Sequence, residues 1–320
     1  MTLIQLADRV RTEADAYREL ERMRWHGTPV CPHCHSEDVG YMRPANGVSR
    51  RTRTGAMSER RVWQCRECRK QFSATTGTVM HGSKVSLRIW LLCFYEMCLS
   101  KNGVAAREIE RKYGVCPRTA WHLMHRIREA MKGDLAELLE GVIVADETFI
   151  GGKEANKHAD KRLDVGGGAG GKTAVFTLID SHTGEARSRV VADVSGPTLA
   201  KAMAEQVRMN FSTLYTDEAQ SYRKIGQKFL AHHTVNHSED EYARYLPGQV
   251  VTTNKAENFF SQLKRSIDGT HHHVSREHLP RYLAEFDFRY SSRKISDEAR
   301  MTKLVGQVGG KRLTYKLVTH

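Results

Sequence analysis

Residues 141–152 read GVIVADETFIGG, an apolar run rich in β-branched residues that leads to the pair Asp146 and Glu147. A run of this kind is typical of a buried β-strand. Downstream, residues 173–194 (TAVFTLIDSHTGEARSRVVADV) predict a hairpin that turns at 182–184, and residues 197–211 predict an amphipathic helix. A short strand, TLYTD, then ends at Asp217, and a helix at 221–229 and an edge strand at 232–238 follow.

This order of elements is that of a ribonuclease-H-like fold, in which a mixed five-stranded sheet is flanked by helices. In that fold the first and fourth strands are adjacent and parallel. We therefore expect Asp146 and Asp217, each at the end of a strand, to lie side by side. Glu147 competes with Asp146, but neighbouring strand residues point to opposite faces, so one of the two serves a site.

A third acid comes from residues 251–290, VTTNKAENFFSQLKRSIDGTHHHVSREHLPRYLAEFDFRY. Asn254 is the predicted N-cap of a helix, and Glu257, three residues later, completes a capping-box-like pattern. Lys264 lies seven residues further on and so returns to the face of Glu257. The alternative is that Glu257 only caps its helix and Lys264 is solvated; the two aspartates favour a site. Asn254 and Asn258 remain alternatives to Glu257 as the third ligand.

Three carboxylates in this arrangement suit two divalent cations, Mg²⁺ or Mn²⁺, because hard ions prefer oxygen ligands. We expect Asp146, Asp217 and Glu257 to be the ligands. One cation would activate a water or a DNA 3′-hydroxyl, and the other would stabilise charge on the leaving oxygen. Lys264 would reach a phosphate of the bound strand.

Two CxxC pairs near the N-terminus predict a structural zinc ribbon, because each pair can offer two thiolates to one tetrahedral ion. A redox pair or a chance match is the alternative, and His33 and His35 could compete as ligands. The predicted ligands are Cys31, Cys34, Cys65 and Cys68.

Positive charge points to a polyanionic partner, since the formal net charge is +13 and residues 40–72 hold nine Arg or Lys against two acids. The insert between the cysteine pairs is expected to lie along phosphate, with a solvated loop as the alternative. Its arginines are Arg50, Arg51, Arg53, Arg60 and Arg61.

Residues 103–131 predict a helix-turn-helix that turns at Gly114, the second helix beginning near Pro117. A plain helical hairpin is the alternative. The DNA-contacting residues predicted on the second helix are Arg118, His122, Arg126 and Arg128.

The chain of 320 residues, 40% apolar and 27% charged, is expected to be globular with two or three domains. The charged N-terminus carries no visible secretory signal, and the longest apolar run, 89–99, is too short to span a bilayer. A soluble cytoplasmic protein without a membrane partner is therefore expected.

Together, the zinc ribbon with QFSATTGTVMHGSKVSLRIW, the segments VADETFIGGKE and YTDEAQSY, and the 251–290 stretch resemble the ISXO-like family of bacterial insertion-sequence transposases. The resemblance runs from about residue 31 to 293. It implies a DDE-type domain in which Asp146, Asp217 and Glu257 are catalytic, with a matching lysine at Lys264, and some relatives carry Asn as the third residue.

The resemblance also implies a bacterial, nucleoid-associated DNA transposase that binds terminal inverted repeats, cuts and joins strands, and assembles as a homo-oligomer on paired DNA ends with target DNA. Alternatives are a DNA-binding regulator with a relict catalytic domain, or a metal-dependent nuclease without strand transfer. The expected division is an N-terminal helical segment (1–28), zinc ribbon (29–80), helix-turn-helix region (81–138), catalytic domain (139–295) and an unassigned tail (296–320).

Overall fold

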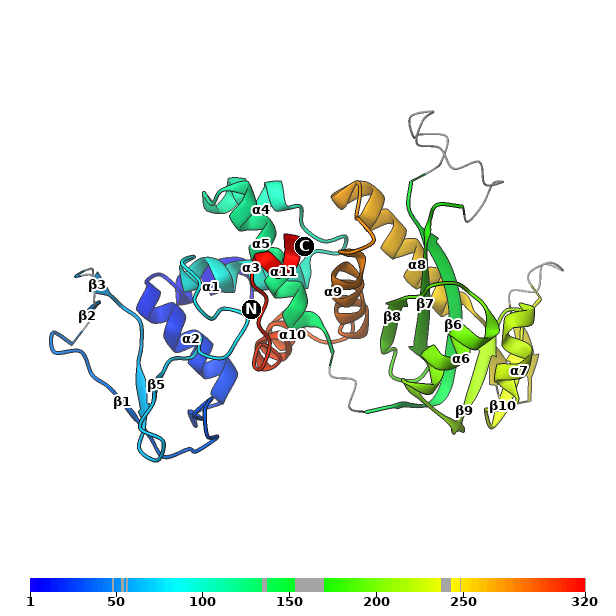
Figure 1. Ribbon diagram of the computed structural model, residues 1–320, viewed down its shortest axis with the longest axis horizontal. Helices are drawn as coiled ribbons and strands as arrows, with labels where there is room; N and C mark the ends of the chain where they lie inside the picture. The colour runs from blue at the N-terminus through cyan, green and yellow to red at the C-terminus, as the bar shows by residue number, and fades with distance from the viewer. Residues whose placement is uncertain are drawn as a thin grey trace. The chain divides into compact units, whose positions relative to one another are not determined.

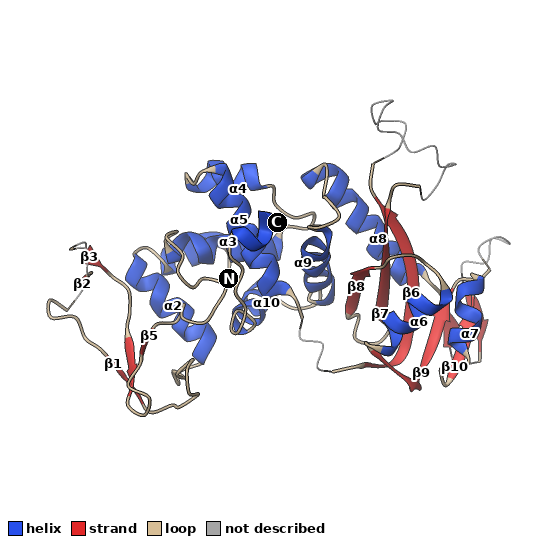
Figure 2. Cartoon of the chain, viewed as in Figure 1, coloured by secondary structure: helices blue, strands red, loops and turns tan. Residues whose placement is uncertain are grey.

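The computed structural model describes residues 1–47, 49–52, 55, 57–133, 137–152, 170–236, 243–247 and 249–319. The chain forms two compact units, each with its own core. One comprises residues 1–131 and 295–320, and the other comprises residues 132–294. The first unit is mainly helical, whereas the second contains the large sheet (Figures 1 and 2).

The first unit begins with α1 (Leu3–Arg9) and α2 (Glu13–Trp25), as the mixed-charge N-terminal sequence predicts. Both start at a threonine, Thr2 and Thr12, whose hydroxyl accepts the backbone N–H three residues on. The side chain of that third residue accepts the N–H of the threonine in return, so each helix has a complete capping box.

The zinc-ribbon region of the first unit is a three-stranded antiparallel sheet in the order β1-β4-β5. Its strands are β1 (Val39–Tyr41), β4 (Trp63–Cys65) and β5 (Gln71–Phe72). The insert between β1 and β4 carries a small arm of two paired strands, β2 (Arg50–Arg51) and β3 (Met57–Ser58). Trp25 of α2 packs edge-on against Trp63 and Phe72, at centroid distances of 5.9 and 6.0 Å, and so ties the sheet to the helices.

The two helices and the turn expected in this unit are present. After the apolar α3 (Leu87–Leu99), α4 (Ala106–Tyr113) ends at Gly114, and α5 (Pro117–Met131) follows. Gly114 has φ 63°, a left-handed conformation that suits glycine and turns the chain. The C-terminal part of the chain adds α10 (Asp297–Gly306) and α11 (Lys316–Thr319) to the same unit.

The second unit is built on a five-stranded mixed sheet in the order β10-β9-β6-β7-β8. Renumbered by chain order within the unit, this is 5-4-1-2-3, the ribonuclease-H-like order that the sequence predicts. The central pair, β6 and β9, is parallel, and β7 and β8 add on antiparallel. The strands are β6 (Leu139–Ile150), β7 (Thr173–Asp180), β8 (Ala186–Val190), β9 (Val207–Thr216) and β10 (Ala231–Thr234).

Helices cover both faces of this sheet (Figure 1). On one face, Val144 and Tyr215 lie in a buried cluster with residues of α8 (Asn254–Ser266) and α9 (Leu279–Ser291). On the other face, Ile143 and Ala145 pack with α6 (Gly196–Ala204) and α7 (Arg223–Gly226). Alternate residues of β6 therefore enter different cores, as strand geometry requires.

Shorter elements complete the second unit. A 3₁₀ turn precedes α7, a two-stranded hairpin precedes α8, and a π-helical turn extends α8 toward α9. They are η3 (Gln220–Tyr222), β11 (Arg244–Leu246), β12 (Gln249–Val251) and η5 (Ile267–His271).

Several predicted boundaries in the second unit are wrong. Asp146 does not end its strand, because β6 continues to Ile150 in a long hairpin with β7. The helix predicted over 197–211 ends at Ala204, and β9 starts at Val207 because its first residues pair with the start of β6. The helix predicted at 221–229 is reduced to η3 and one turn of α7.

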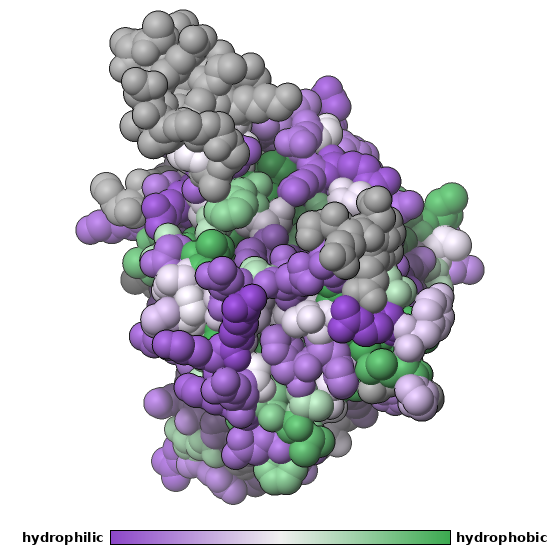
Figure 3. All heavy atoms as spheres, turned by 90° about the vertical axis from the view of Figure 1, so that its right-hand side faces the viewer, coloured by the Kyte–Doolittle hydropathy of each residue, from purple (hydrophilic) through white to green (hydrophobic). Residues whose placement is uncertain are grey.

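None of the helices in the described part of the chain combines the length and apolar character that crossing a bilayer requires. On the face of the molecule shown in Figure 3, hydrophilic side chains predominate and apolar ones lie in small separate groups.

Candidate active site and metal centre

The two aspartates predicted from strand ends lie on the adjacent parallel strands β6 and β9. Their ladder pairs Val142 with Thr213 and Val144 with Tyr215, so continuing the register by two residues sets Asp146 opposite Asp217. Val144 and Tyr215 belong to the core beneath α8, and Asp146 follows Val144 by two residues, so it points to the same side. The parallel ladder stops before this pair, which leaves the two carboxylates at the opening between the strands.

Glu257 comes to this side of the sheet from the first turn of α8. Asn254 is not the N-cap that the sequence predicted: Thr253 holds that position, and its side chain makes no capping bond. The buried Thr253 instead donates its hydroxyl to Glu257 Oε1 at 3.1 Å. The expected capping box is therefore absent at this helix, and Glu257 is oriented by Thr253.

The electrostatics of Asp146 show that the three acids share one neighbourhood. Burial, together with the negative charges of Glu147, Asp217 and Glu257, raises the pKa of Asp146 to about 7, against a bond from the backbone N–H of Glu147 that lowers it. A carboxyl group with such a pKa lacks a compensating positive charge. Burial and surrounding acids make its charged form costly, which is the condition that a bound cation relieves.

Glu147 projects to the other face of the sheet, although its charge still acts on Asp146. By strand alternation it faces the core that contains Tyr222, and the Tyr222 hydroxyl donates a short hydrogen bond to its carboxylate. Burial and the negative charge of Asp217 raise the pKa of Glu147, while the bond from Tyr222 opposes the rise. Tyr222 belongs to η3, five residues after Asp217, so the bond links the strand of one predicted catalytic aspartate to the turn that follows the other.

That turn also fixes the second aspartate directly. Asp217 Oδ1 accepts the backbone N–H of Ala219 at 3.0 Å, and the Thr216 hydroxyl donates to the Asp217 carbonyl at 2.7 Å. His232 of β10 contacts the same hydroxyl at 2.9 Å. Both predicted aspartates are thus oriented by their own local backbone.

The remaining predicted residues of this site are exposed on α8, as Glu257 is. Lys264 and Asn254 are both exposed. Asn258 accepts a bond of 2.5 Å from Gln262, one turn along the helix. The charge of Glu257 acts on Asp146. Which residue of α8 is the third ligand stays a prediction.

The donor set suits a hard divalent cation, since it consists of carboxylate oxygens, among them that of the half-buried Asp146. These carboxylates are not drawn as tightly together as the four cysteines, which in the described residues are the group whose donor atoms lie within 4.8 Å of one another. Mutual repulsion among the acids gives a physical reason for that difference.

The four cysteines form the closed site that the CxxC pairs predict. Their sulfurs are 3.7 Å apart for Cys31 and Cys68, and 3.5 Å apart for Cys34 and Cys65. A zinc ion about 2.3 Å from each sulfur in a tetrahedron sets the sulfurs about 3.8 Å apart, so the arrangement fits zinc. The cluster includes neither His33 nor His35.

Both cysteine turns have the same backbone form. The residue after the second cysteine, His35 in one turn and Arg69 in the other, is left-handed, with φ of 62° and 59°. The backbone N–H of His33 points to Cys31 Sγ and that of Cys68 to Cys65 Sγ. Donors of this kind stabilise thiolates, which supports a structural metal site.

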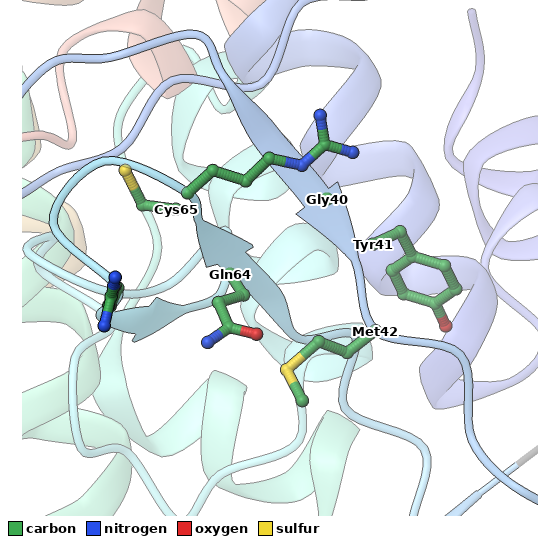
Figure 4. Close-up of a pocket in the computed structure, with 7 residues that line it drawn as sticks. Gly40, Tyr41, Met42, Gln64 and Cys65 are labelled. Carbon is green, nitrogen blue, oxygen red and sulfur yellow. The ribbon is translucent and has the colours of Figure 1, made fainter.

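The β1–β4 pair beside the cysteines has two different faces. Tyr41 and Trp63 stack at 5.4 Å on the face toward α2, with the Arg61 guanidinium 4.2 Å from the Tyr41 ring centroid. The other face carries a pocket of about 380 Å³, in which Met42 and Gln64 project to the same side (Figure 4). Arg66 and Arg69 also line this pocket, so it is basic.

The predicted DNA-contacting residues divide by exposure. Arg51 and Arg118 are exposed, and Arg50 and His122 are half-buried. Arg53 lies outside the described residues.

The predicted DNA-contacting arginines in the C-terminal half of α5 are not at the surface. Arg126 and Arg128 are buried, with 8% and 1% of their surface exposed. Arg126 donates to the carbonyl of His81 at 2.8 Å and lies over the Trp90 ring. We therefore correct the expectation for these two arginines, since their guanidinium groups lie in the interior. Helical periodicity did not reveal how deeply this half of α5 packs.

Two residues that orient the acidic site, Tyr222 and Thr253, were not identified from the sequence. Tyr222 reaches a partner 75 residues away, and no local pattern signals such a contact. Thr253 directly precedes the predicted N-cap, and a shift of one position in the helix start would have indicated it.

Two sequence models of known families match the chain. One describes an ISXO2-like transposase domain and matches residues 138–291, and the other describes a transposase zinc-ribbon domain and matches residues 11–71. Together they span more than half of the chain, and each falls on the region where the corresponding site was found.

A relative and a solved structure are also similar. The "uncharacterized protein in transposable element ISH50" of Halobacterium salinarum is 27% identical over 304 residues, covering 92% of this chain and 96% of that protein. A chain in the cryo-EM structure of the simian T-cell lymphotropic virus intasome in complex with PP2A regulatory subunit B56 gamma is 13% identical, with a TM-score of 0.26, covering 56% of this chain and 63% of that one.

Proposed function

The chain belongs to the ISXO2-like transposase family, and from that premise we propose that it binds the terminal inverted repeats of its own element and catalyses metal-dependent cleavage and transfer of DNA strands. The proposed catalytic residues are Asp146, Asp217 and Glu257. Lys264 is proposed to contact a phosphate. The proposed partners are the element ends and a target duplex, with two or more copies of the chain acting on paired ends.

The observation that carries this proposal is the environment of Asp146. It is half-buried, it feels the negative charges of Asp217 and Glu257, and its pKa is raised to about 7. A cluster of like charges in a partly buried place is costly for the fold, and perturbed acids of this kind concentrate at functional sites. In a transposase-family domain, a cation site for phosphoryl transfer is the use that explains this cost.

A divalent cation held there would stabilise charge on the phosphate and on the attacking and leaving oxygens. The chain's own residues set the geometry. The parallel β6 and β9 hold Asp146 and Asp217 opposite each other, and Thr253 orients Glu257. The Glu147–Tyr222 bond keeps the second acid of the pair out of the site.

The test uses a supercoiled plasmid that carries the DNA flanking the gene. Purified protein is added with Mg²⁺ or Mn²⁺, and wild type is compared with Asp146→Asn, Asp217→Asn and Glu257→Gln. Nicking at the element ends that needs the cation and is lost in all three variants is the expected result. Asp268→Asn, an exposed acid in η5, is the matched control and should cut like wild type.

Other results would replace parts of the proposal. Binding to the ends without cutting, under all cation conditions, would favour a DNA-binding regulator. Cleavage without any joined product would indicate a nuclease. If Glu257→Gln is the one variant that keeps full activity, the third ligand is another residue of α8.

A further inference from the structure

The C-terminal segment, to which no role was assigned from the sequence, is a structured part of the first unit. Gly309 forms an antiparallel bridge with Thr78, in the segment that follows the zinc ribbon. Val79 donates its N–H to the Val308 carbonyl at 3.1 Å, and Gly310 donates to the Gly77 carbonyl at 2.9 Å. The chain is thereby anchored beside the ribbon before it continues.

From this anchor the segment runs antiparallel along α5. Lys311 Nζ donates to the carbonyl of Ala130, near the end of the helix. Four residues later, the Tyr315 ring lies against His122 at a centroid distance of 5.5 Å, and the Arg118 guanidinium is 5.7 Å from the Tyr315 centroid. The buried Leu313 and Val318 hold the segment in place.

The part of α5 beside Tyr315 is the part that can meet DNA. Pro117 and Arg118 are exposed and His122 is half-buried, whereas the helix is largely buried from Leu123 onward. In helix-turn-helix proteins the N-terminal residues of the second helix contact base edges. Here those residues share one surface with the C-terminal segment.

This shared surface is positively charged. Residues 307–320 contain three basic residues and no acid. Arg312 and Lys316 are exposed, and Tyr315 keeps 38% of its surface exposed while it contacts Arg118. Basic side chains beside an exposed aromatic ring match the chemistry of a nucleic-acid backbone and its bases.

We propose that the C-terminal segment is part of the DNA-binding surface of the first unit: Arg312 and Lys316 contact backbone phosphates, and Tyr315 sets the position of Arg118 at the start of α5. The inference rests on the proposed function, because it needs DNA at the helix-turn-helix. A segment that blocks α5 is the rival. Its charge argues against that role, since a basic segment attracts the same polyanion as the helix it lines.

The test measures binding of the intact, zinc-loaded chain to a short fluorescent duplex carrying one element end, over a range of salt concentrations. In Arg312→Ala/Lys316→Ala, the slope of log K against log salt should become less negative by about 1.8, because each lost phosphate contact contributes about 0.9. At 0.15 M salt the same loss corresponds to a roughly 30-fold weaker affinity.

The matched control is Arg11→Ala/Lys303→Ala, which removes the same charge from exposed positions elsewhere on this unit. Its slope should stay within experimental error of wild type. Tyr315→Ala tests the aromatic contact: it should lower the preference for the element end over a scrambled duplex, with little change in salt slope. Arg118→Ala should lower this preference in the same way. The double variant should lose no more preference than either single variant.

The outcomes separate this inference from the proposed function. If wild type does not bind the duplex, the proposed function is contradicted and the inference falls with it. If wild type binds and the Arg312/Lys316 variant keeps its slope, the inference alone is overturned. Tighter binding by a chain that ends at residue 310 would show that the segment blocks α5.

Discussion

The cysteine cluster and the acidic group both bring like-charged donor atoms together, but the chain does this in a different way at each. Each half of the cysteine cluster lies within one turn of four residues, and the turn's own N–H groups face the sulfurs. The acidic group is assembled from β6, β9 and α8, which meet through long-range packing. The cysteine site is built from short local turns and is closed. The acidic site joins segments that are far apart in the sequence and is open.

The difference shows in the charge each site leaves uncompensated. Sulfur atoms 3.5–3.7 Å apart already have the spacing of a tetrahedral metal site. The acids are not closed to that degree, and the pKa of Asp146 stays raised to about 7. A closed donor set is typical of structural metals, and an open one is typical of catalytic metals, which must leave room for substrate.

The largest effect is expected at the closed site. Cys65→Ser should lose zinc and unfold the ribbon, since zinc binding contributes about 10 kcal/mol or more to the folding of small zinc domains. Trp25 and Trp63 pack in this core, so their fluorescence should shift to the red as zinc content falls. Cys116→Ser, at an exposed cysteine outside the cluster, should retain zinc. A Cys65→Ser protein with full zinc would contradict the contrast.

At the open site the expected effect on activity is large and the effect on stability has the opposite sign. Asp146→Asn should reduce strand cleavage by roughly a hundredfold to a thousandfold, which corresponds to several kcal/mol of lost charge stabilisation. The same change should stabilise the cation-free protein at alkaline pH.

The sign of that stabilisation follows from the raised pKa of Asp146. Below pH 3.8, the ordinary pKa of an aspartate, the protonated Asp146 carboxyl contributes its full share of the folding stability. That contribution is lost as the pH rises through about 7, where Asp146 ionises in the folded protein. Above that pH, Asp146→Asn should gain roughly 2 kcal/mol over wild type after allowance for screening. Thermal unfolding of the zinc-loaded protein in buffer without Mg²⁺ or Mn²⁺, at pH 5 and pH 8.5, measures it. Equal stability of both proteins at pH 8.5 would contradict the account.

A smaller effect is expected for the bond that links the two aspartate segments. Tyr222→Phe removes the hydroxyl that donates a hydrogen bond to Glu147. A hydrogen bond to a charged group contributes about 1.5–3 kcal/mol. Cleavage should slow about 10- to 100-fold, as for residues that orient metal ligands, with DNA affinity unchanged. Tyr245→Phe, at an exposed tyrosine, is the control. Weakened DNA binding with unchanged cleavage rate would count against a positioning role.

The smallest effect is expected at Thr253→Val. It removes the hydroxyl that orients Glu257 but leaves a side chain of similar volume, so the stability loss should be about 0.5–1.5 kcal/mol. Cleavage should fall several-fold, and higher Mn²⁺ should restore most of it because the ligand itself remains. Thr302→Val in α10 serves as the control. No change in cation requirement would mean that Thr253 does not act through Glu257.

The same local-versus-distant contrast explains what the sequence could reveal. The CxxC spacing and the Gly114 turn are local signals, and the structure has both the cysteine cluster and the two helices. The family resemblance and the ribonuclease-H-like strand order are confirmed as well. The catalytic roles of Asp146, Asp217 and Glu257 stay predictions.

What the sequence missed depends on contacts between distant segments. β9 begins six residues before the predicted strand because its start pairs with β6, and such pairing is invisible in a local window. The burial of Arg126 comes from packing against His81 and Trp90. The role of Tyr222 depends on Glu147 across the sheet.

The most direct test of the central claim is to locate the cation. Fe²⁺ replaces Mg²⁺ in the intact protein, and ascorbate with peroxide then generates radicals that cut the chain next to the bound ion. The account predicts three sites of scission, near Asp146, Asp217 and Glu257, that excess Mg²⁺ suppresses and that Asp146→Asn abolishes. Scission elsewhere in the chain, or scission that Mg²⁺ does not suppress, would contradict the claim that these three segments hold one metal centre.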